Sequence, residues 1–72
     1  MTRPRWTTIS RNERAVSVGD RHFFAMRCNP STLWHIEELD VPVQTNEGRI
    51  IQVVADRMTT RDVTRWLKEL RT

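Results

Sequence analysis

The spacing of the apolar residues changes once along this chain, near residue 59, and this change limits the folds that the chain can adopt. Beyond it, four apolar residues recur at helical intervals: Val63, Trp66, Leu67 and Leu70. This spacing is typical of one face of an amphipathic α-helix. Thr59 or Thr60 is a suitable N-cap, and Asp62 places a negative charge in the first turn. The pattern predicts one helix over residues 60–71.

Before residue 59 the chain reads as short β-strands separated by turn residues. The predicted strands are Trp6–Ser10, Arg14–Val18, His22–Cys28, Leu33–Leu39 and Arg49–Ala55. Gly19-Asp20 and Asn29–Thr32 are strong turn signals, and residues 44–48 form a polar loop. Consecutive strands with short connections favour an antiparallel meander. We therefore expect an α+β fold, in which four to five strands carry one C-terminal helix on one face.

The length of the chain limits its function. Its 72 residues make one small domain, in which residues 1–5 form a flexible basic tail and residues 6–72 form the folded unit. Cys28 is the single cysteine, so no intrachain disulfide is possible. No apolar run approaches the ~20 residues of a membrane span, and no secretory signal is evident. We expect a cytoplasmic protein without a membrane partner, and exclude a multidomain enzyme and a Rossmann domain.

Both faces of the predicted sheet carry large apolar side chains. Because side chains alternate along a strand, Phe23 and Ala25 point one way while Phe24 and Met26 point the other way. One helix of about twelve residues spans ~18 Å and covers only one face. Either the sheet curls enough to bury both faces, or the second face meets a second copy of the chain or a host protein, and we expect the latter. The candidate contact residues are Phe23, Phe24 and Trp34.

The charge distribution suggests a second kind of partner. The net charge is +3, and only one of the twelve basic residues is lysine. Arginine suits bidentate phosphate contacts, although a GC-rich genome enriches it equally. The candidate nucleic-acid contacts are Arg3 and Arg5 in the tail, Arg27 and Arg49 among the strand arginines, and Arg61, Arg65 and Lys68 along the helix. The group of strand arginines also includes Arg14 and Arg21. The alternative is that these are solvated charges, and that strand arginines pair with Glu37, Glu38 or Asp56.

Catalytic and metal-binding patterns are weak. His22, Cys28 and His35 lack the spacing of a zinc motif. Glu37 and Glu38 are adjacent on a strand, so their carboxylates diverge and cannot act as an acid pair. We predict no catalytic residues, no metal and no cofactor, and therefore a protein that is not an enzyme.

The segment from Trp34 to Leu70 resembles the arm-type DNA-binding domain of phage and mobile-element integrases. The matching features are Trp34 in a strand, Gly48-Arg49 after a polar loop, and a helix that begins at Thr60 and contains Trp66-Leu67. The resemblance implies that the sheet reads DNA, with Arg27 and Arg49 nearer the bases than the helix. The chain departs from that three-stranded pattern by two additional predicted strands and an acidic loop.

These features lead to two functional hypotheses. The first is a small non-enzymatic nucleic-acid-binding protein of phage or mobile-element type, which binds mainly through phosphate contacts. The alternative is a small interaction module or inhibitor that docks on a host protein through an exposed sheet face. The acidic segment Glu37–Asp40 and the apolar residues on both sheet faces favour the alternative.

Overall fold

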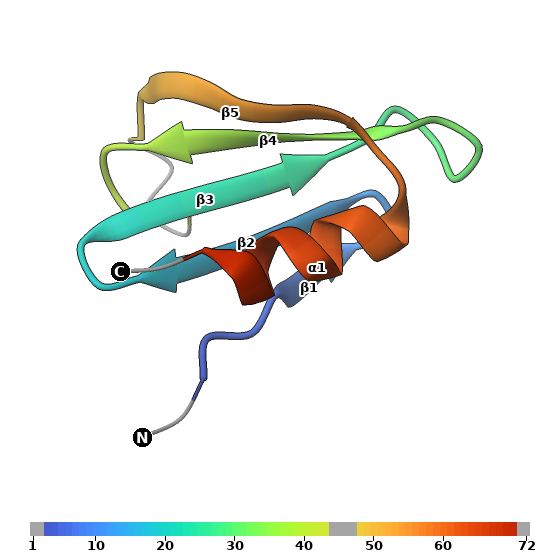
Figure 1. The fold of residues 1–72 in the computed structure, drawn as a ribbon. Coiled ribbons are helices and arrows are strands. Elements are labelled where there is room, and N and C mark those ends of the chain that lie inside the picture. The colour runs from blue at the N-terminus through green and yellow to red at the C-terminus, as the bar shows by residue number, and fades with distance from the viewer. Residues whose placement is uncertain (1–2, 44–47, 71–72) are drawn as a thin grey trace.

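Five antiparallel strands and one C-terminal helix form the protein (Figure 1). The computed structural model describes residues 3–43 and 48–70. The elements are β1 (Thr7–Ser10), β2 (Glu13–Val18), β3 (Arg21–Met26), β4 (Trp34–Leu39), β5 (Ile50–Met58) and α1 (Thr60–Glu69). The strands lie in sequence order in one sheet, and α1 crosses one of its faces. The predicted α+β meander is confirmed.

The core lies between α1 and this covered face of the sheet. Its buried apolar residues are Val16, Val18, Phe23, Ala25, Trp34, Ile36 and Val63. Trp66 of α1 packs edge-on against Phe23, with 5.0 Å between the ring centroids. Phe23 is 0% exposed and Trp34 is 1% exposed. The prediction that these two residues contact a partner is therefore wrong, because the helix covers the side of the sheet on which they lie.

The helix begins at a capping box. The Thr59 hydroxyl accepts a hydrogen bond from the Asp62 backbone N–H at 3.1 Å, and the Asp62 carboxylate accepts one from the Thr59 N–H at 3.1 Å. These bonds lower the pKa of Asp62 below its usual value. Thr59 is thus the N-cap, while the Thr60 hydroxyl accepts a hydrogen bond from the Trp34 indole at 3.0 Å. This contact fixes the start of the helix against β4.

Strand β5 differs most from its prediction. It extends to Met58, three residues beyond the predicted end, and its pairing with β4 shifts register at three points. Arg57 has a φ of 55°, a conformation that few residues other than glycine adopt. Such irregularities bend a strand, and here they precede the chain's turn into α1. Of the predicted polar loop 44–48, residues 44–47 lie outside the described residues.

The second face of the sheet, which we call the open face, is only partly covered by the described chain. Ile9 and Val53 lie on it and are 49% and 58% exposed. Phe24 is half-buried. Pro42 and Val43, which follow β4, line a shallow hollow with open-face residues of β1 and β2. The prediction that one helix covers a single face is confirmed, and the segment after β4 adds partial cover to the other face.

Candidate nucleic-acid interface

The core packing of α1 determines which of its side chains face solvent. Val63 and Trp66 pack toward the sheet, so the helical period turns Arg61, Arg65 and Lys68 outward. These three cations line one shallow hollow on the helix surface, together with Thr60 and Thr64. The structure therefore brings the three predicted helix cations together.

The N-terminal tail lies beside this helix. The Trp6 indole donates a hydrogen bond to the Val63 carbonyl at 3.1 Å, and its ring centroid lies 6.1 Å from that of Trp66. These contacts connect residues that are 57 positions apart in the sequence. Arg3 and Lys68 border one hollow beside the helix. Met1 and Thr2 lie outside the described residues, so the predicted tail is described only from Arg3 onward.

A third hollow is lined by residues from three parts of the chain. Its lining residues are Pro4, Arg5 and Trp6 from the tail, Arg14 from β2, and Thr64, Leu67 and Lys68 from α1. We call it the tail–helix hollow. It collects three cations from sequence positions that are far apart. We use the name basic face for the surface that carries Arg3, Arg5, Arg14, Arg61, Arg65 and Lys68.

Within the described part of the chain, no ion pair neutralises the cations of the basic face. Among residues 3–43 and 48–70, the ion pairs are Arg21–Glu38 and His35–Glu37, and neither includes a cation of the basic face. Asp62 lies close enough to Arg61 and Arg65 for their charges to help lower its pKa, but its carboxylate is already engaged in the helix cap. The basic face therefore keeps a net positive charge.

The two strand arginines predicted as nucleic-acid contacts, Arg27 and Arg49, lie in different environments. The Arg27 guanidinium donates to the Asn12 side chain at 3.1 Å and to the Arg11 carbonyl at 3.0 Å, and lies 4.5 Å from the Trp34 ring centroid. It is thus held mainly by intramolecular contacts. Arg49 lies at the opposite end of β4, where its backbone N–H donates to Asp40 at 2.8 Å. The structure does not bring Arg49 together with the basic face.

Sequence analysis grouped Arg14 with the strand arginines rather than with the helix cations, and it did not assign Trp6 to the site. Arg14 alternates with Val16 and Val18 along β2, so it lies on the helix side of the sheet. The alternation that groups Arg14 with Val16 and Val18 was visible in the sequence, but it does not show which face of the sheet the helix covers. No comparable signal links Trp6 to Val63, because that contact depends on the tertiary fold.

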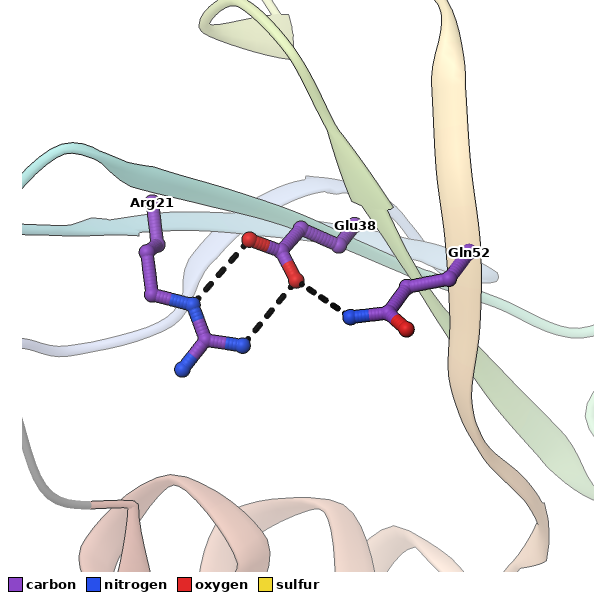
Figure 2. A network of polar contacts seen from close by, with 3 residues as sticks. All are labelled: Arg21, Glu38 and Gln52. Carbon is purple, nitrogen blue, oxygen red and sulfur yellow. Dashed lines mark hydrogen bonds and ion pairs between the residues drawn. The ribbon is translucent and has the colours of Figure 1, made fainter.

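Arg21 is neutralised within the fold (Figure 2). Its guanidinium makes two hydrogen bonds of 3.0 Å to Glu38, and Gln52 donates a third bond of 3.0 Å to the same carboxylate. Figure 2 shows the three side chains converging from β3, β4 and β5 on the side of the sheet that faces the helix. These hydrogen bonds, led by those from Arg21, lower the pKa of Glu38 to about 2.

Because of this network, we predict that the stability of the fold decreases at acid pH. The ordinary pKa of Glu38 is 4.5, so the ionised carboxylate stabilises the fold fully above that pH and progressively less as the pH falls toward about 2. Because Arg21 is partly exposed, solvent screening limits the effect. Glu38→Gln is expected to lower the free energy of unfolding at pH 7 by about 1–2 kcal/mol.

Urea unfolding of the wild type and Glu38→Gln between pH 7 and pH 2 measures this contribution. The difference between the two proteins should shrink as the pH falls below 4.5, the ordinary pKa of this carboxyl. Glu37→Gln is the matched control, because Glu37 is the neighbouring residue on β4 and lies on the open face, away from Arg21. A Glu38→Gln effect of the same size at every pH would contradict the assigned role of the ion pair.

The open face has a different chemical character. The His35 Nε2 atom lies 3.3 Å from a Glu37 carboxylate oxygen, and the Ser17 hydroxyl is hydrogen-bonded to the His22 Nδ1 atom at 2.7 Å. Phe24, also on this face, is the one of the three predicted partner contacts that is not in the core. Within the described parts of the chain, no three His, Cys, Asp or Glu residues gather into a metal-binding group. The face therefore offers apolar and acidic groups rather than phosphate-binding cations.

The fold and the basic face define a small α+β protein with one cationic side. Comparisons with family models, with curated proteins and with solved structures found no match for this chain. The resemblance to integrase arm-type domains, and the phage or mobile-element origin that it suggests, stay predictions. No helix in the described chain has the length and apolar character needed to cross a membrane.

Proposed function

We propose that this protein binds nucleic acid through its basic face. The observation that carries the proposal is the tail–helix hollow, where Arg5, Arg14 and Lys68 meet without a described carboxylate partner. Cations from three elements are brought to one surface by folding, and phosphate oxygens are the chemical groups that such a surface favours. Arg61 and Arg65 continue the same surface along α1.

Binding of this kind neutralises phosphates and releases their counterions, so it depends steeply on salt. The helix side of the sheet would face the nucleic acid and the open face would point away. This arrangement differs from the one that the integrase resemblance implies, in which the sheet contacts the DNA. Here Arg27 is engaged within the fold, and Arg49 lies at the far end of β4.

A titration of a labelled duplex and a labelled single strand at two salt concentrations tests the proposal. If about four cations contact duplex phosphates, raising the salt from about 50 mM to about 200 mM should weaken duplex binding by roughly 100-fold. A smaller loss is expected for the single strand, because its charge density is lower. Absence of binding to both ligands at the lower salt would refute the proposed function.

The exposed apolar residues of the open face favour a second candidate function, docking on a host protein. Ile9 and Val53 are about half exposed there, on the same face of the sheet as the half-buried Phe24. A pulldown from a nuclease-treated lysate distinguishes the candidates. A partner that is retained after nuclease treatment, and lost in a Val53→Lys variant, would support protein docking. Loss of every partner with nuclease would leave nucleic-acid binding as the explanation.

A further inference from the structure

We propose that the tail–helix hollow accepts an unstacked nucleobase, so that the preferred ligand of the basic face is single-stranded nucleic acid. This inference rests on the proposed function and specifies its ligand. It follows from the kinds of side chain that line the hollow, which are apolar and aromatic groups together with cations.

Pro4, Trp6 and Leu67 supply the apolar part of the lining. The Trp6 ring is held in place by the hydrogen bond from its indole N–H to the Val63 carbonyl and by its contact with Trp66. It is half-buried, so part of its surface is accessible. A fixed aromatic ring of this kind is a suitable stacking platform for a nucleobase, whose two faces are also aromatic.

Arg5, Arg14 and Lys68 supply the charged part of the same lining. A nucleotide presents its base and its phosphate groups a short distance apart. An aromatic ring and cations in one hollow can therefore contact both parts at once. The Thr64 hydroxyl donates to the Thr60 carbonyl at 3.3 Å, which leaves its oxygen able to accept a hydrogen bond from a base N–H.

The other aromatic rings do not offer an equivalent platform. Phe23 and Trp34 are buried, and Trp66 packs between Trp6 and Phe23. Phe24 lies on the open face, away from the basic face. In a duplex the bases are stacked on one another and cannot reach the Trp6 ring, so only an unpaired base can use the tail–helix hollow. A duplex would contact the cations alone.

Three ligands of equal length separate base stacking from phosphate contact: an oligothymidine strand, an abasic strand with the same phosphates, and a duplex. At one fixed salt concentration, the wild type is expected to bind oligothymidine about 5- to 100-fold more tightly than the abasic strand. Oligothymidine should also quench the tryptophan fluorescence. In Trp6→Leu, the oligothymidine affinity should fall to the level of the abasic strand.

Trp6→Phe keeps an aromatic ring and should keep most of the preference for oligothymidine. Thr64→Leu narrows the hollow from an exposed helix position without altering Trp6. It should reduce the preference even if Trp6→Leu fails to fold. Circular dichroism checks the fold of each variant.

Equal wild-type affinity for oligothymidine and the abasic strand would overturn the nucleobase site and leave the proposed function intact. Failure of all three ligands to bind at low salt would instead refute the proposed function, and this inference with it.

Discussion

Replacing Trp34 by alanine is expected to lower the free energy of unfolding by about 3–5 kcal/mol, the range typical of large buried aromatic residues. Trp34 is 1% exposed and connects three parts of the fold. Its ring lies under the guanidinium groups of Arg14 and Arg27, at 4.9 and 4.5 Å, and its indole N–H bonds to Thr60 at the start of the helix. The substitution removes the packing and these contacts together.

This loss is large relative to the stability of so small a domain, which is about 4–11 kcal/mol at the usual stability per residue. Chemical denaturation followed by circular dichroism measures it. Leu33→Ala is the matched control, because Leu33 is the neighbouring residue and is 51% exposed. Its effect should stay within about 0.5 kcal/mol. Similar denaturation midpoints for Trp34→Ala and Leu33→Ala would show that Trp34 is not central to the core.

The second large effect concerns binding. Reversing the charge of the three helix cations, in the variant Arg61→Glu/Arg65→Glu/Lys68→Glu, is expected to weaken nucleic-acid binding by at least about 100-fold near 100 mM salt. The three side chains line one hollow and point away from the core, so the fold should tolerate the substitutions. A fluorescence anisotropy titration measures the affinity, and thermal unfolding confirms that the variant is folded.

Much of the fold could be predicted from the sequence because its signals are local. The alternation of side chains correctly separated Phe23 from Phe24, and the helical spacing of Val63, Trp66 and Leu67 identified the helix. Such patterns depend only on the periods of strands and helices. The extension of β5 was missed, since Asp56 and Arg57 have little strand propensity and occupy an irregular segment.

Alternation alone could not show which face of the sheet the helix covers. For that reason Phe23 and Trp34 were predicted as partner contacts although they form the core. The candidate site was predicted only in part for a related reason. The three helix cations recur at helical spacing, so the sequence alone groups them. By contrast, Arg5, Arg14 and Lys68 come together only through contacts between the tail, β2 and α1. Sequence spacing carries no signal for such distant contacts.

The most direct test of the basic face compares the helix charge-reversal variant with one of equal net charge. Arg11→Glu/Arg49→Glu/Arg57→Glu changes three exposed arginines outside the basic face. At ~0.15 M salt, charges more than about 8 Å away are largely screened, so position should dominate over net charge. We predict that the helix variant loses at least about 100-fold in affinity and the control less than about 10-fold. Equal losses in the two variants would contradict a localised interface.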